Sequence, residues 1–285
     1  MRQLTRALRR WASRLPQKPR VEWERSRRLG QRVLPADRAR VPRDHRLRGA
    51  TPQAVLGDVL AWLVTTYPFP HARRRTHRLL PEPAERVLRR LLKRSARWPA
   101  GPAAQGRVLE EVLGARANYL HELGLTLYHP QITRELSAAT IWERALGART
   151  VAHEYWHSLR RERPRFFPFE EGAADLFATV AVYEMTGADT SGVAAYPELA
   201  AGAQLLSELL GGVRGLMGSR AAPDQSAWLR GRLSALGAPG WALEDVLRPI
   251  RADGSQDALW YHRVESLYRE VKDETLRVPP APSAQ

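Results

Sequence analysis

Residues 150–160 read "TVAHEYWHSLR", and this stretch decides how the rest of the chain is interpreted. His153 and His157 are four positions apart, and Glu154 directly follows the first of them. Each helical residue turns by about 100°, so the two histidines lie about 40° apart on one face, one turn from each other. Two imidazoles in that arrangement can bind one tetrahedral metal ion, and Glu154 can reach a water on that ion without being a ligand. The stretch therefore predicts a metal-binding helix that carries its own general base.

A second stretch, "FEEGAADLFA" at 169–178, supplies carboxylates that can complete the site. A catalytic zinc site has three protein ligands and one open position, and the chain has no cysteine to offer. Glu171 can be the third ligand, because Asp175 lies one turn further and can accept the free N–H of a ligand histidine. Glu170 is the competing third ligand, but the residue four positions after it is an alanine. The spacing favours Glu171.

Together, the two stretches resemble a known class of zinc enzymes. H-E-x-x-H followed by E-x-x-x-D is similar to the gluzincin pattern, and "RTVAHEYWHSL" with "EEGAADLFA" resembles the ImmA/IrrE family of bacterial and phage metallopeptidases. The family's second pattern is matched at Glu171, Ala174, Asp175, Phe177 and Ala178. Tyr155-Trp156 stands where that family commonly has Leu-Gly. The resemblance covers residues 150–178 and implies a zincin fold that cleaves a protein or peptide substrate.

The expected chemistry requires one zinc ion. Zinc lowers the pKa of a bound water to about 7, and Glu154 would take the proton and pass it to the leaving amine. A further donor to the oxyanion is expected. Tyr261 and His262 are candidates by residue type alone, and ordinary packing or a surface position is the alternative for both. Two alternatives for the whole motif are a helix with a buried structural histidine and a zincin that binds metal without cleaving.

The positive charge of the chain is concentrated near its N-terminus. The formal net charge is +15, with 16 Lys and Arg against 4 Asp and Glu in residues 1–50, and 14 against 18 in residues 151–285. Such asymmetry suggests a basic arm for an anionic partner, either a nucleic acid or a membrane surface, and a solvated extension is the alternative. A second hypothesis is therefore a nucleic-acid-binding protein with an inactive zincin body.

The remaining features of the sequence limit the fold class and the expected cellular location. The chain has no cysteine, no run of 18 apolar residues and no apolar secretory signal, so we expect a cytoplasmic protein without disulfides. The expected class is α+β and predominantly helical, a zincin-like domain with a small sheet. We divide the chain into an Arg-rich flexible arm (1–50), the domain (51–275, with the metal-site core at about 107–190) and a disordered tail (276–285). The oligomeric state stays open.

Local signals predict the elements around the motif. Thr51 and Pro52 begin a helix, and Thr140 with Glu143 forms a capping box before the motif helix. Further helices are expected at 82–97 and 107–123, and a strand at 125–132. In the Arg-rich run before residue 79, His77 is interpreted as solvated.

Overall fold

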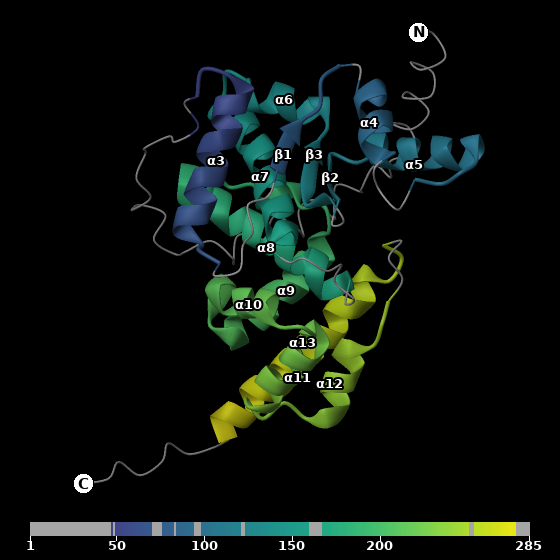
Figure 1. The fold of residues 1–285 in the computed structure, drawn as a ribbon. Coiled ribbons are helices and arrows are strands. Elements are labelled where there is room, and N and C mark those ends of the chain that lie inside the picture. Colours follow the sequence, from purple (N-terminus) through teal and green to yellow (C-terminus); the bar gives the residue numbers. More distant parts are fainter. Residues whose placement is uncertain are drawn as a thin grey trace.

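The computed structural model describes Leu47 and residues 49–69, 76–82, 84–93, 98–120, 123–159, 167–250 and 254–277. This part of the chain is mostly helical with one small sheet, which confirms the expected α+β class with a predominance of helix (Figure 1). The first elements are α3 (Pro52–Thr66), β1 (Thr76–Leu79), α4 (Glu85–Leu92), α5 (Pro102–Gly114), β2 (Ala117–Leu120), β3 (Leu125–Tyr128) and α6 (Pro130–Leu136). The others are α7 (Ile141–Ser158), α8 (Phe167–Thr186), the short 3-10 helix η3 (Ser191–Val193), α9 (Pro197–Leu210), α10 (Gly212–Ala221), α11 (Gln225–Ser234), α12 (Gly240–Leu247) and α13 (Asp257–Arg277).

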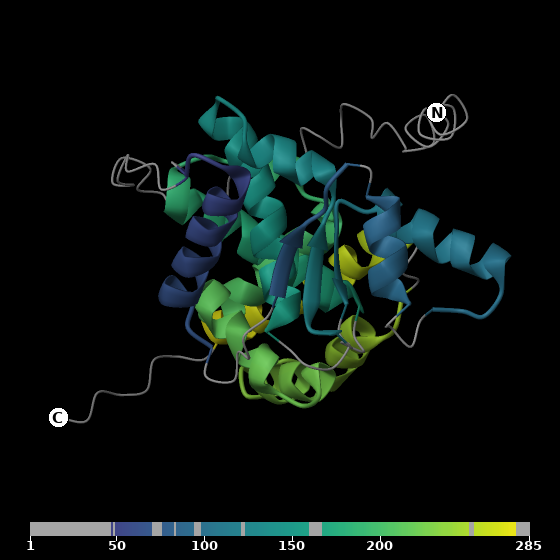
Figure 2. The same cartoon turned by 45° about the horizontal axis from the view of Figure 1, so that its top comes forward.

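The sheet has three strands in the order β1-β3-β2, with β1 parallel and β2 antiparallel to β3. In both views it lies between α3 on one side and α4 with α5 on the other (Figure 2). Strand β1 was not predicted, and the interpretation of His77 as solvated is wrong. His77 Nδ1 lies 2.8 Å from the hydroxyl of Tyr128, and the two rings stack. Burial lowers the pKa of His77 to about 4. The parallel pairing with a strand almost fifty residues later leaves no local signal in the sequence.

Side-chain caps begin the helices that position the site. Thr51 Oγ1 accepts a hydrogen bond from the backbone N–H of Ala54 at 3.2 Å. Thr140 Oγ1 accepts from the backbone N–H of Glu143 at 3.2 Å, which confirms the N-cap half of the predicted capping box. The Glu143 carboxylate accepts from the Thr140 hydroxyl at 2.6 Å. From this cap α7 runs without a break through Gly147 into the motif. The Thr140 cap therefore fixes where the helix that carries His153 and His157 begins.

Other element boundaries differ from the prediction. The helix expected at 82–97 is α4 in the structure, and it is shorter than predicted. The helix expected at 107–123 is replaced by α5 and then β2, because the chain turns after Gly114 to pair with β3. The strand expected at 125–132 ends at residue 128, because Pro130 begins α6 and the ring of His129 caps it. Propensity alone did not reveal these tertiary pairings.

The main hydrophobic core surrounds the packed pair α7 and α8 and continues into α9 and α13. Leu47 belongs to this core, and its carbonyl accepts a hydrogen bond from Arg144 of α7. Of the predicted arm, residues 1–46 and 48 lie outside the described part, and so do residues 278–285 of the predicted tail. Within the described residues, no helix combines the length and apolarity needed to cross a membrane.

One glycine sets the distance between α8 and α9. A Cβ at Gly172 would lie 2.3 Å from the carbonyl oxygen of Leu199, which is closer than any real contact. The backbones of the two helices therefore approach closely at the residue next to Glu171. This close packing against α9 constrains the part of α8 that carries Glu171.

Candidate metal centre

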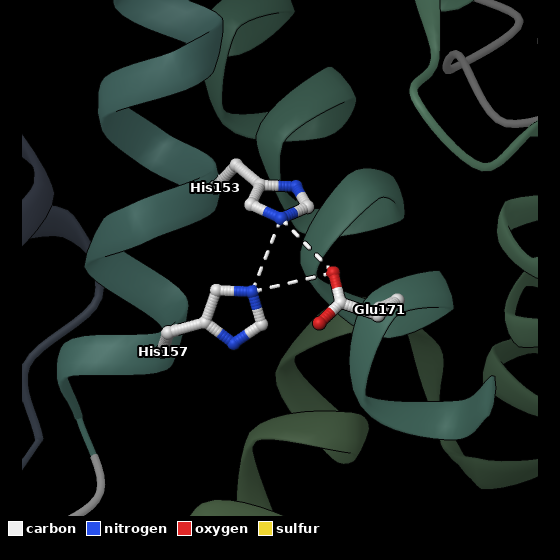
Figure 3. A group of neighbouring side chains, drawn as sticks. All are labelled: His153, His157 and Glu171. Carbon is white, nitrogen blue, oxygen red and sulfur yellow. Dashed lines mark hydrogen bonds and ion pairs between the residues drawn. The ribbon is translucent and has the colours of Figure 1, made fainter. Parts of the chain in front are cut away.

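Helices α7 and α8 bring the three predicted ligands together (Figure 3). His153 Nε2 and His157 Nε2 are 3.1 Å apart. Glu171 Oε2 lies 3.4 Å from the first of these nitrogens and 3.5 Å from the second. One oxygen and two nitrogens thus form a compact triangle between two packed helices.

The triangle has the size of a tetrahedral zinc site. Zinc–ligand bonds of about 2.0–2.2 Å at tetrahedral angles place neighbouring ligand atoms about 3.3–3.6 Å apart. The three separations of 3.1, 3.4 and 3.5 Å are close to that range. The side chains of His153, His157 and Glu171 keep 12, 11 and 19% of their exposure, so the group is largely buried but still reachable from solvent. The group can hold a metal ion.

The outer nitrogen of His153 is fixed by Asp175. The Asp175 Oδ1 atom lies 3.1 Å from His153 Nδ1, which is the contact that the helical spacing predicted. Asp175 is itself held by the guanidinium of Arg149 at 2.7 Å and by the backbone N–H of Tyr196 at 2.7 Å. A carboxylate at Nδ1 selects the tautomer with the proton there and leaves the Nε2 lone pair for a metal.

The outer nitrogen of His157 has an equivalent partner that sequence reasoning missed. Glu170 Oε1 lies 3.0 Å from His157 Nδ1, on the opposite side of the ring from Glu171. Glu170 is held by Arg220, which donates to both of its oxygens, and by Gln225 at 2.7 Å. In this structure Glu170, the competing candidate for the third ligand, contacts the outer nitrogen of His157 instead. Its partners are about fifty residues further along the chain, beyond the reach of any local pattern.

The electrostatics of the group favour a cation. Burial alone would lower the pKa of His153, but its hydrogen bonds to Asp175 and Glu171 raise it to about 9. Burial would likewise lower the pKa of His157, but the charge of Glu171 and the hydrogen bond to Glu170 hold it well above its ordinary value. The carboxylates in or beside the triangle are Glu154, Glu170, Glu171 and Asp175, and the buried guanidinium groups that pair with two of them are Arg149 and Arg220. With all four acids ionised and both histidines neutral, as metal ligation requires, two negative charges remain, which a divalent ion would balance.

Glu154 lies beside the triangle without being part of it. Its side chain is buried, and its Oε2 has no hydrogen-bond partner among the described residues. Burial raises the pKa of this carboxyl, while the neighbouring histidines lower it by a smaller amount. A buried carboxylate oxygen without a hydrogen-bond partner requires an explanation. One explanation is that this oxygen is placed to accept a proton from a water molecule, as a general base does.

The two residues proposed for the oxyanion lie on α13. Tyr261 donates to Glu265 at 3.4 Å, and His262, with 59% of its side chain exposed, pairs with the same carboxylate at 3.5 Å. These contacts give no support to an oxyanion role. Tyr196 was missed by sequence reasoning. Its backbone N–H donates to Asp175, and burial and the charges of Glu171 and Asp175 raise the pKa of its hydroxyl.

No protein-family model, curated protein or solved structure gives a significant match to this chain.

Proposed function

We propose that this protein is a zinc-dependent metallopeptidase that hydrolyses a peptide bond in a protein substrate. The single observation that carries the proposal is the triangle of His153, His157 and Glu171, with donor separations of 3.1–3.5 Å that suit a tetrahedral ion. The resemblance of residues 150–178 to gluzincins and the ImmA/IrrE family supports peptide hydrolysis over other zinc chemistry. The zincin-like identity of the fold belongs to the same proposal.

The donor set favours zinc over magnesium and calcium. Two imidazoles and one carboxylate suit zinc, whereas magnesium and calcium prefer oxygen ligands alone. The chain has no cysteine, so no thiolate competes for the ion. Three protein ligands leave one position open, which is the arrangement of a catalytic rather than a structural site.

The chain's own residues would divide the work as follows. Bound zinc supplies a Lewis acid that activates water and polarises the scissile carbonyl. Glu154 would hold the proton removed from the attacking water and deliver it to the leaving amine. Asp175 and Glu170 would hold the rings of His153 and His157 with their Nε2 atoms toward the ion.

A cleavage assay with metal removal tests the proposal. The purified protein is incubated with a mixture of unfolded proteins and with a peptide library, and fragments are identified by mass spectrometry. We expect cleavage that stops after dialysis against a chelator and returns with zinc. Cleavage that persists without metal, or no cleavage by protein loaded with zinc, would contradict it.

A nucleic-acid-binding protein is the second candidate. The positive charge of residues 1–50 favours it, and so does one feature of the described structure. Helix α4 exposes Arg86, Arg89, Arg90 and Lys93, and of these only Arg89 pairs with an acid described in the structure, Glu85. Exposed arginines on one short helix can contact phosphates. The two functions are compatible, because α4 is separate from the helices that carry the metal triangle.

A further inference from the structure

Glu170 is clamped by side chains from two helices that follow it by about fifty residues. Arg220, in the last turn of α10, donates through Nη1 to both carboxylate oxygens. Gln225, the first residue of α11, donates through Nε2 to Oε2 at 2.7 Å. The side chains of Arg220 and Glu170 keep only 0 and 1% of their exposure. A charge pair this deeply buried is costly unless its geometry is good, and here the carboxylate has several donors.

The same guanidinium also contacts the metal-binding helix. Arg220 Nη2 donates to the carbonyl oxygen of His157 at 3.2 Å, and its Cζ lies 5.2 Å from the centre of the Trp156 ring. One side chain therefore fixes the backbone of His157 and the carboxylate that fixes the ring of His157. The counterpart on His153 differs, because Arg149 belongs to α7 itself, one turn before that histidine.

We infer that Arg220 is a positioning residue for the metal site, which acts through Glu170 to hold the His157 ring in its metal-binding orientation. This inference rests on the proposed metal site. Without Arg220, the Glu170 carboxylate loses its charged partner and keeps only Gln225 at Oε2 beside its contact with His157, so it is held less firmly against His157 Nδ1. The ring can then rotate about its side-chain bonds. Groups that orient metal ligands in this way typically contribute about 10–100-fold to metal affinity.

A purely structural ion pair is the alternative, and it makes a different prediction. Such a pair would attach α10 to α8 and affect zinc binding only through the stability of the fold. Replacing both partners with apolar residues of similar volume often leaves stability unchanged or increases it. Replacing both Glu170 and Arg220 with apolar residues therefore separates a structural role from a positioning role, because the double replacement restores the packing without restoring the hydrogen bond to His157.

The test uses the full chain and two measurements. Arg220→Met and the double variant Glu170→Leu/Arg220→Met are compared with wild type, and Arg230→Met, which breaks an exposed ion pair with Glu244, is the matched control. Stability is measured by urea unfolding of the metal-free proteins. Zinc affinity is measured by competition with a chromophoric chelator, and the visible spectrum of bound Co²⁺ reports the ligand geometry.

We expect Arg220→Met to be less stable than wild type and the double variant to recover stability. Both should bind zinc about 10–100-fold more weakly and change the Co²⁺ spectrum, whereas Arg230→Met should match wild type. If Arg220→Met does not fold, the double variant decides. A stable double variant with wild-type zinc affinity and an unchanged Co²⁺ spectrum would overturn the inference. A wild-type protein that binds no zinc would overturn the proposed function instead.

Discussion

The carboxylates of Glu170 and Glu171 contact opposite nitrogens of one imidazole. Glu170 Oε1 lies 3.0 Å from His157 Nδ1, and Glu171 Oε2 lies 3.5 Å from His157 Nε2. Consecutive helical residues point about 100° apart, so two adjacent acids can reach around a ring that projects toward the helix. One acid of this pair holds the outer nitrogen of the histidine, and the other lies where it could share the proposed metal ion with the inner nitrogen.

Glu154→Gln separates metal binding from cleavage. We expect the variant to bind zinc as wild type does, because Glu154 is not part of the ligand triangle, and to lose at least about 100-fold in cleavage, the usual contribution of a general base. The variant should also be no less stable. The raised pKa of Glu154 means that its ionised form costs stability above the ordinary pKa, and glutamine carries no charge. Zinc content, a cleavage assay and thermal unfolding check the three statements, and undiminished cleavage would exclude Glu154 as the base.

Acid should destabilise the metal-free protein through Glu170. Burial would raise the pKa of this carboxyl, but Arg220 and the hydrogen bond from His157 lower it from 4.5 to about 2. A carboxyl with a lowered folded-state pKa contributes stability that is present above pH 4.5 and is lost as the pH falls through about 2. The expected loss is on the order of 3 kcal/mol. Urea unfolding across this pH range should show a smaller loss for Glu170→Leu/Arg220→Met, and equal losses would contradict the assignment.

Gly172→Ala should disturb the packing of α8 on α9. The new methyl group would meet the Leu199 carbonyl oxygen at 2.3 Å, a backbone atom that cannot move alone. Overpacking of this kind costs about 1–3 kcal/mol. Gly57→Ala in α3 is the matched control, since nothing lies within 4 Å of its added methyl group, and helix propensity predicts a gain of about 0.5–1 kcal/mol. Chemical denaturation measures both, and a neutral Gly172→Ala would show that the two helices are less closely fixed.

Deletion of residues 1–46 tests the second candidate function. This segment holds 15 Lys and Arg against 4 Asp and Glu, and the deletion keeps Leu47, which belongs to the core. If the basic segment binds nucleic acid, wild type should bind DNA or RNA with an affinity that falls steeply with salt, and the deletion should weaken it. Glu154→Gln should leave this binding unchanged. Fluorescence anisotropy with a labelled oligonucleotide checks both statements. Equal binding by the truncated chain would show that residues 1–46 do not carry the nucleic-acid binding.

The helical spacing of the motif was sufficient to predict much of the group. His153 and His157 share a face of α7, and Asp175, one turn after Glu171, contacts a ligand histidine as expected, although the spacing did not show that this would be His153. The cap of α7 at Thr140 could likewise be predicted, because the hydroxyl and the backbone N–H that it accepts from are three residues apart. These features depend on short segments whose geometry is set by helical periodicity.

The remaining parts of the site depend on contacts between distant segments. Arg220 reaches Glu170 only because α10 folds back onto α8, and Tyr196 reaches Asp175 only because the chain turns before α9. Strand β1 was missed for the same reason, since it is stabilised by pairing with β3 rather than by its own propensity. Periodicity shows which face of a helix is buried but not which remote side chain packs against it.

The zinc content of the purified protein tests the central claim most directly. Elemental analysis is made on wild type and His153→Ala after dialysis against buffer with trace zinc. The proposed site predicts one zinc ion per wild-type chain and almost none in the variant, because two remaining ligands bind zinc far more weakly than three. Wild-type protein without stoichiometric metal, or equal zinc in both proteins, would contradict the claim that these two helices form a metal centre.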